Sequence, residues 1–332
     1  MIDCHAHAFP DVTYQTSRFL ESISANAARQ FRQTVSPYLS VQSEAFSALC
    51  AFLARPAKSG NSSLDIESVA RLRSHLPAAV NKWLEIPMSV AGMPLTLLSG
   101  TIDQLLQSMR RTRIEQSLLI AAPPIAPNTW VLGEALNRDP QSLIPVCTLP
   151  AVSADASEQA WVDGFADLAK LGARGFKIHP NIDGLDAGHT AYRAMFQVAE
   201  SHGLFIILHT GKFTTVVNKH NRPADPFEYK PLFQDHPRVR VCLAHMNRDE
   251  PAFAWEIMKQ CDQLFADTSW QPAHTLVRAL KTIGCDRVLL GSDWPLLHPD
   301  LQKNALDILS RATSEKEFEA ITRKNPRRFL ER

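Results

Sequence analysis

Two histidines near the start of the chain, in the stretch MIDCHAHAFP, have the spacing of a metal-ligand pair. A β-strand points alternate side chains to opposite faces. His5 and His7 are therefore expected to share one face with Asp3, while Cys4 faces the other way. A His-x-His pair also arises on solvated surfaces, so its chemistry depends on what the fold brings beside it.

Other polar residues stand at the ends of apolar runs farther along the chain. They are Lys177 and His179 in ARGFKIHP, His209 in LFIILHTG, His245 in VRVCLAHMN and Asp293 in DRVLLGSDWP. The middle of an apolar run does not tolerate an unpaired charge or imidazole. The shared position predicts that these side chains meet at one end of a set of strands.

Neutral imidazoles and a carboxylate are ligands that Zn²⁺ prefers, and a catalytic site keeps one position open for water. We expect His5, His7 and His209 to hold one zinc ion. Asp293 is expected to contact both the ion and its water, whose pKa the ion brings toward neutrality. Asp293 would accept the proton of that water and pass it to a leaving group, with His245 as a neighbouring acid-base or polarising group.

The loops that follow the strands supply candidates for the substrate pocket. These candidates are Lys212, Asn247, Arg248, Trp270 and Trp294, together with His179 at the end of its strand. Trp294 is favoured as a pocket wall. His179 precedes Pro180, so a hydrogen bond in the rim would explain this histidine equally well. Polar loop residues are usually solvated, so these assignments depend on the fold.

A repeating pattern of elements would position these residues. Eight apolar runs are typical of strands, at 2–7, 117–124, 143–150, 173–180, 204–211, 239–247, 263–270 and 286–295. Near-continuous apolar runs indicate parallel strands covered on both faces, and segments with helical spacing, such as 156–170 and 190–203, separate them. Eight strand–helix units predict an α/β fold, a (β/α)8 TIM barrel with its functional residues at the C-terminal strand ends.

A long insertion interrupts the first of these units. The helix that should follow the first strand begins only at a capping box of Thr101 and Gln104, far beyond an ordinary loop length. We therefore assign 1–10 and 99–332 to a metal-dependent TIM-barrel domain and 11–98 to a helical insertion subdomain. The insertion is expected over the barrel mouth, and the alternative is that it packs on the barrel side or forms an oligomer contact.

Composition narrows the classes of partner. The chain has 35 Lys and Arg against 34 Asp and Glu, a formal net charge of +1, so neither nucleic acid nor a membrane surface is expected to bind. No stretch approaches the ~20 apolar residues of a membrane helix, and the start lacks the order of a signal peptide. We expect a cytoplasmic protein with buried thiols and a small-molecule substrate, and a homo-oligomer is compatible with the sequence.

The polar residues taken in order resemble the amidohydrolase superfamily. The segments IDCHAH, GARGFKIHP, LHTG, LAHMN, LLGSDWP and NPRRFL resemble the amidohydrolase-related family that includes aminocarboxymuconate semialdehyde decarboxylase-like enzymes. The resemblance covers 1–10 and 100–332. It implies a metal-dependent hydrolase, lactonase, hydratase or nonoxidative decarboxylase of small carboxylated or aromatic compounds, but it does not give the substrate.

Lys177 departs from the decarboxylase-like pattern, which the resemblance implies to be mononuclear and without such a lysine. In other branches of the superfamily, a lysine at this strand end is carboxylated and bridges two metals, with the fifth- and sixth-strand histidines on the second ion. We favour one zinc ion per chain, with an unmodified Lys177 as the cation for a substrate carboxylate. Two ions would follow if Lys177 is carboxylated.

The first functional hypothesis is a metal-dependent hydrolase of a small amide, ester or lactone, with a carboxylated substrate favoured. Its metal-bound hydroxide would attack the carbonyl. The alternative is a nonoxidative metal-dependent decarboxylase of a small carboxylated or aromatic compound, which would use the same ligands. A third hypothesis is a barrel that serves only as a binding or structural subunit, and the complete set of candidate ligands argues against it.

Overall fold

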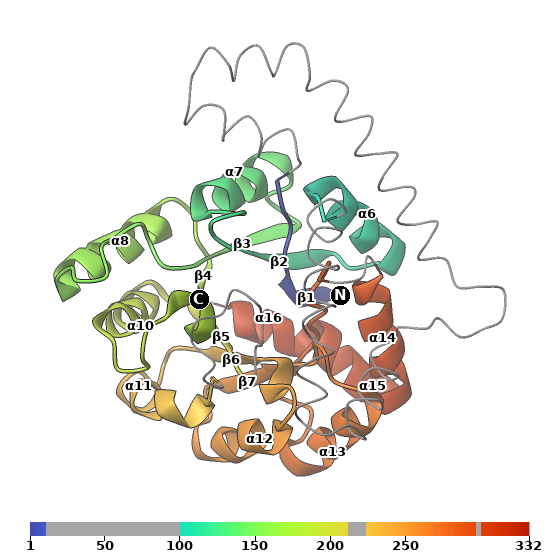
Figure 1. Cartoon of the computed structure of the whole chain (residues 1–332). Helices are drawn as coiled ribbons and strands as arrows, with labels where there is room; N and C mark the ends of the chain where they lie inside the picture. The colour runs from blue at the N-terminus through green and yellow to red at the C-terminus, as the bar shows by residue number, and fades with distance from the viewer. Residues whose placement is uncertain (11–99, 212–223, 297–299, 332) are drawn as a thin grey trace, which may run out of the picture.

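Eight parallel strands lie side by side in the order of the chain, as the sequence predicted (Figure 1). The computed structural model describes residues 1–10, 100–211, 224–296 and 300–331. The predicted insertion at 11–98 and Lys212 lie outside the described residues. The strands are β1 (Ile2–Ala6), β2 (Gln116–Ile120), β3 (Leu143–Cys147), β4 (Gly175–Ile178), β5 (Phe205–His209), β6 (Val241–Ala244), β7 (Leu264–Asp267) and β8 (Val288–Leu289).

Backbone hydrogen bonds between the first and last strands close the sheet into a TIM barrel. The backbone N–H of Cys4 donates to the carbonyl of Leu290 at 2.8 Å, and that of Asp293 donates to the carbonyl of His5 at 2.7 Å. All eight strands are parallel, so their C-terminal ends lie at the same end of the barrel. The closing seam therefore joins the strand that carries the first two histidines to the segment that carries the aspartate.

Helices surround the strands (Figure 1). They are α6 (Ile102–Thr112), α7 (Asn128–Arg138), α8 (Glu158–Lys170), α9 (Pro180–Asp183), α10 (Thr190–His202), α11 (Lys230–Asp235), α12 (Pro251–Gln260), α13 (Ala273–Ile283), α14 (Leu301–Ala312), α15 (Glu315–Glu319) and α16 (Asn325–Leu330). Gln104 Oε1 accepts the backbone N–H of Thr101 at the start of α6, and Gly203, with φ of 65°, ends α10. Among the described helices, none is long and apolar enough to cross a membrane.

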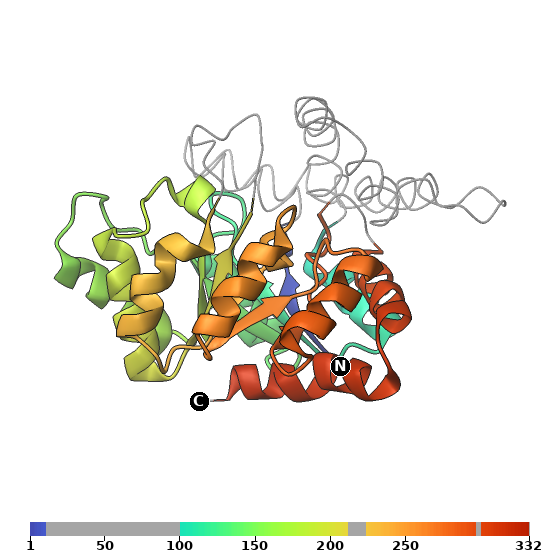
Figure 2. The ribbon, with the colours of Figure 1, turned by 90° about the horizontal axis from the view of Figure 1, so that it is seen from below.

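Apolar side chains fill the barrel below the polar strand ends. The interior group comprises Ile2, Cys4, Leu118, Ile120, Ile144, Val146, Phe205, Ile207, Cys242, Ala244, Phe265, Leu289 and Phe329. Phe329 comes from α16 and contacts the rings of Phe205 and Phe265 at centroid distances of 4.8 and 5.2 Å. Figure 2 shows the C-terminal helices across the end of the barrel at which β1 begins. One end is therefore closed, and the polar strand ends lie at the other.

A β-bulge in β1 changes which residues face the barrel interior. Asp3 pairs with Ser117 of β2, and Ala6 pairs with Leu119, so three steps along β1 match two along β2. The extra residue breaks the simple alternation of side chains between the two faces.

The expectation that Asp3 shares the face of His5 and His7, with Cys4 turned away, was therefore wrong. Cys4 packs with the apolar interior residues. Asp3 faces the outer layer, where its Oδ2 accepts a hydrogen bond from Nε2 of Gln302 in α14 at 3.0 Å. The bulge keeps both histidines directed into the barrel despite this change.

Candidate metal centre and active site

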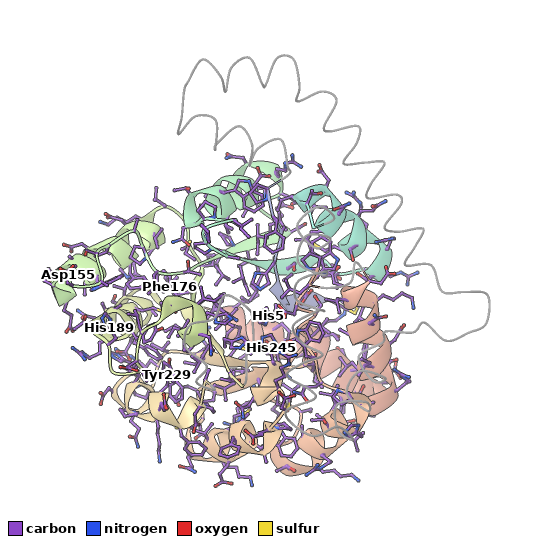
Figure 3. All side chains as sticks on the ribbon, viewed as in Figure 1. His5, Asp155, Phe176, His189, Tyr229 and His245 are labelled. Carbon is purple, nitrogen blue, oxygen red and sulfur yellow. The ribbon has the colours of Figure 1, made fainter. Side chains whose placement is uncertain are left out.

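The predicted polar residues come together at the C-terminal end of the barrel. His5 lies in β1 and His7 directly follows it, while Lys177 lies in β4 and His209 ends β5. His245 directly follows β6, and Asp293 comes in the loop after β8. Figure 3 shows His5 and His245 beside each other near the middle of the barrel, with Asp155, His189 and Tyr229 farther out. The rings of His5 and His245 are stacked, with centroids 4.8 Å apart.

Three donor atoms converge in the manner of a metal site. Oδ1 of Asp293 lies 3.3 Å from Nε2 of His5 and 3.4 Å from Nε2 of His7. These three side chains each offer one ligand atom, and the three atoms lie within 4.8 Å of one another. Two imidazole nitrogens and a carboxylate oxygen are donors suited to Zn²⁺ and similar ions, so the residues fit a bound divalent metal.

The protonation states around these donors also suit a metal. Burial lowers the pKa of His5, and the nearby Lys177 lowers it further, so the imidazole is neutral near pH 7. Burial alone would raise the pKa of Asp293, but His5, His7 and His245 outweigh it and hold that pKa well below its ordinary value. A neutral imidazole and an ionised carboxylate are the forms that bind metal ions.

His209, the fourth predicted ligand, is not one of these three donors. Its Nδ1 lies 3.2 Å from Nε2 of His245, and its ring stacks on that of His179 with centroids 4.0 Å apart. With Nδ1 directed at His245, any metal contact from His209 would use Nε2. The stacking also brings His179 into the site beside a predicted ligand.

His245 is held by protein groups at both ring nitrogens. Its Nδ1 lies 2.7 Å from Oγ of Ser269, and its Nε2 faces His209. Burial lowers the pKa of His245 to about 3, so the ring is neutral at pH 7. This arrangement lets His245 orient the His209 ring, in addition to the acid-base role expected from the sequence.

Asp267, at the end of β7, is a site residue that the sequence reasoning missed. It is fully buried. Its Oδ2 lies 2.8 Å from Nδ1 of His5, and its Oδ1 accepts the backbone N–H groups of His245 at 3.1 Å and Ser269 at 3.0 Å. Asp267 follows the apolar residues 264–266 of the run 263–270, as the predicted residues follow the apolar part of theirs, so the signal was present in the sequence.

The two tryptophans considered for the pocket have different surroundings. Nε1 of Trp270 donates to Oδ2 of Asp293 at 2.6 Å. Trp294 is 1% exposed and packs in the hydrophobic core formed between the strands and the outer helices. Trp270 therefore contacts a candidate functional carboxylate.

Lys177 is a buried amine beside the donor group. It is 3% exposed, and its Nζ lies 3.4 Å from Nε2 of His5. Burial lowers the pKa of Lys177, while the carboxylates of Asp293 and Asp267 favour its protonated form. An ammonium in this position is available to an anionic group that enters the site.

Three of the strand ends carry residues in left-handed backbone conformations. His245 after β6, Trp270 after β7 and Asp293 after β8 have φ of 60°, 61° and 58°. Non-glycine residues adopt this conformation at a cost, and such residues cluster at functional sites. The strain is thus located where the candidate catalytic side chains are directed into the barrel.

Comparison with known proteins gives one family and several relatives. A family model described as amidohydrolase matches residues 2–332. Among curated proteins, a gamma-resorcylate decarboxylase from Rhizobium sp. (strain MTP-10005) is 28% identical over 120 residues. That match covers 30% of this chain and 36% of the relative, so it spans about a third of the relative's length.

Solved structures share the fold. An uncharacterised TIM-barrel protein, Bb4693 from Bordetella bronchiseptica, has a TM-score of 0.60 at 17% identity, covering 80% of this chain and 89% of that one. A 2,6-dihydroxybenzoate decarboxylase from Rhizobium has a TM-score of 0.56 at 21% identity, covering 79% of this chain and 94% of that one. At these identities, the likeness concerns the fold alone.

Proposed function

The chain belongs to the amidohydrolase family, and on that premise we propose that it is a metal-dependent, nonoxidative decarboxylase of a small aromatic carboxylic acid. The sequence placed hydrolysis first and decarboxylation second. The curated relative matched over 120 residues is a decarboxylase, which favours the second hypothesis. Fold likeness alone does not choose a reaction, so the proposal depends on the site.

The observation that carries the carboxylated substrate is the buried amine of Lys177 beside the donor group, a residue at which the chain departs from the decarboxylase-like pattern. Its Nζ lies 3.4 Å from Nε2 of His5, within the group of side chains that would hold the metal. A buried cation is costly unless an anion compensates it. A substrate carboxylate would provide that anion, so the site suits a carboxylated substrate better than a neutral amide or ester.

The ligands that we propose for the metal are His5, His7 and Asp293, with His209 at the end of β5 as the fourth. A divalent ion bound there would supply a Lewis acid that polarises the oxygens of the substrate. Lys177 would pair with the substrate carboxylate and fix its orientation. Trp270 donates to Oδ2 of Asp293 and would hold the Asp293 carboxylate in a single orientation toward the substrate.

Asp293 is the proton carrier in this proposal. Its Oδ2 takes a proton from solvent or from a substrate hydroxyl and delivers it to the ring carbon that bears the carboxylate. The bond from that carbon to the carboxylate carbon then breaks. Its electron pair returns to the ring, and the carboxylate leaves as CO₂. The product keeps the added proton on carbon, so Asp293 must be protonated again in each turnover.

Product analysis in D₂O tests the proposal. The zinc-loaded protein is incubated with 2,6-dihydroxybenzoate and other hydroxylated benzoates, and in parallel with aromatic lactones, esters and amides. We expect release of CO₂ and a product with one deuterium at the carbon that lost the carboxylate. Hydrolysis of a lactone, ester or amide, with no CO₂ from any acid, would overturn decarboxylation in favour of the hydrolase hypothesis.

A further inference from the structure

The turn after β6 contains four consecutive non-glycine residues with positive φ. His245, Met246, Asn247 and Arg248 have φ of 60°, 47°, 60° and 38°. Each such residue costs free energy and persists only where its surroundings impose it. The run ends at Arg248, so the strained turn determines where that side chain leaves the backbone.

Two neighbours hold this turn in place. The buried amide of Gln271 donates from Nε2 to the carbonyls of His245 at 2.6 Å and Arg248 at 2.9 Å. Gly211, with φ of 93°, also packs against the turn, since an added Cβ there would stand 3.0 Å from Cβ of Arg248 and 3.1 Å from the backbone of Asn247. The position of Arg248 is therefore constrained by two neighbours.

The half-buried side chain of Arg248 leaves the turn after β6, at the mouth formed by the C-terminal strand ends. Its Cζ is 5.7 Å from the ring centroid of Trp270, and the same ring donates from Nε1 to Oδ2 of Asp293. The positive charge of Arg248 also acts on His209, whose pKa is lowered by burial first and by this charge among others. Arg248 thus lies between the end of β5 and the end of β7, one ring away from the proposed proton carrier.

We propose that Arg248, supported by Trp270, is the binding group for a second anionic substituent of the substrate. The site would then have two cations with different tasks. Lys177 lies deep beside the donor group and would hold the carboxylate that is lost, while Arg248 at the mouth would hold a carboxylate elsewhere on the ring. The substrate class is an aromatic dicarboxylate, and this inference rests on the proposed function for the identity of the first carboxylate.

A second cation–π pair in the barrel shows what a purely structural contact looks like. Arg278 of α13 lies over Trp255 of α12, with its Cζ 5.5 Å from the ring centroid. That pair joins two outer helices, and neither residue has a positive φ. Arg248 differs because a strained turn and a buried glutamine direct it to the site, and because its partner ring contacts Asp293.

Ligand binding to the zinc-loaded protein tests this inference without requiring turnover. The dissociation constants of benzoate, isophthalate and terephthalate are measured by calorimetry. We expect at least one dicarboxylate to bind about 10-fold or more tightly than benzoate, as a charge-assisted contact to a guanidinium would give. In Arg248→Gln, that preference should fall to about 2-fold or less while benzoate binding changes little. Arg278→Gln is the matched control and should keep the preference.

The outcomes separate this inference from the proposed function. No preference for either dicarboxylate in the wild type would overturn the role of Arg248, even if the variant does not fold. A preference that survives in Arg248→Gln would also overturn it. If the preference depends on Arg248 but no acid is decarboxylated, the anion subsite stands and the proposed reaction fails. If an acid is decarboxylated but neither dicarboxylate is preferred over benzoate, the proposed reaction stands and the anion subsite fails.

Discussion

Nδ1 of His5 lies 2.8 Å from Oδ2 of Asp267, and both side chains are buried. Burial alone would raise the pKa of Asp267, but the neighbouring His5 and His245 outweigh it and hold that pKa below its ordinary value. The carboxylate therefore accepts the Nδ1 proton of His5. This fixes the tautomer in which Nε2 carries the lone pair, and Nε2 is the nitrogen that faces Asp293.

Asp267→Asn should weaken metal binding while leaving the fold intact. The amide has only one acceptor oxygen, so the variant loses either the contact to His5 or the contacts to the backbone after β6. We expect the dissociation constant for Zn²⁺ to rise by about 10- to 100-fold, the scale of lost partners behind metal ligands. Competition with a zinc chelator measures this dissociation constant.

Asp262→Asn, at a fully exposed position beside β7, is the control and should bind zinc like the wild type. Equal zinc affinity in both variants would contradict the role of Asp267 in orienting His5.

Asp3→Asn should destabilise the seam between β1 and β8. The buried carboxylate of Asp3 accepts hydrogen bonds from the backbone N–H groups of His5 and Ser292, from Oγ of Ser292 and from Nε2 of Gln302. An amide directs two hydrogens at these donors and leaves buried groups unpaired. We expect the free energy of unfolding to fall by about 2–3 kcal/mol in urea denaturation. A loss below 0.5 kcal/mol would mean that the seam does not depend on Asp3.

The strand ends could be predicted from the sequence because buried strand interiors require apolar residues, whereas polar residues are tolerated where a strand ends. The sequence did not predict which way Asp3 and Cys4 face, because a bulge depends on how β1 pairs with a strand more than a hundred residues away. Side chains alternate strictly between the two faces of a strand only where the pairing is regular, and the extra residue in β1 interrupts that regularity.

Other features of the site depend on backbone conformations that residue types do not reveal. The left-handed φ of Trp270 and Asp293 brings these two side chains into contact. Trp294 is also a tryptophan and directly follows Asp293, but its side chain packs in the hydrophobic core. Asp267 could have been identified, since it follows the apolar part of its run as His209 does. The insertion assigned to 11–98 and the pocket role of Lys212 stay predictions.

A pH effect on stability is expected from Asp183, at the end of α9. Its Oδ2 accepts the backbone N–H of His179 and the hydroxyl of Tyr192, both at 2.9 Å. Burial raises its pKa above the ordinary value for an aspartate, to about 6. The folded protein then binds this proton more tightly than the unfolded chain, so the stabilisation is complete below about pH 4 and is lost as the pH rises through about 6.

Asp183→Asn isolates this effect because the amide does not titrate. The free energy of unfolding of the wild type minus that of the variant should decrease by up to about 3 kcal/mol between pH 4 and pH 7. Urea denaturation at several pH values measures both proteins, and contributions from other groups cancel in the difference. A difference that is constant across this range would show that Asp183 has the same pKa in the folded and unfolded chains.

The number of metal ions is decided by the chemical state of Lys177. An unmodified ammonium 3.4 Å from Nε2 of His5 disfavours a second cation beside it, so we expect one zinc ion per chain by elemental analysis. Lys177→Met should keep that ratio, because the change removes a charge but no ligand. Binding of benzoate should weaken by about 10-fold or more, since its carboxylate loses the buried cation.

Carboxylation of Lys177 would predict the reverse. The protein would bind two ions per chain, and Lys177→Met would lose metal and be rescued in part by added acetate. Incubation with labelled bicarbonate would give a carbamate signal in ¹³C NMR. Any of these results would replace the single-metal arrangement with a bridged pair in which His245 becomes a ligand.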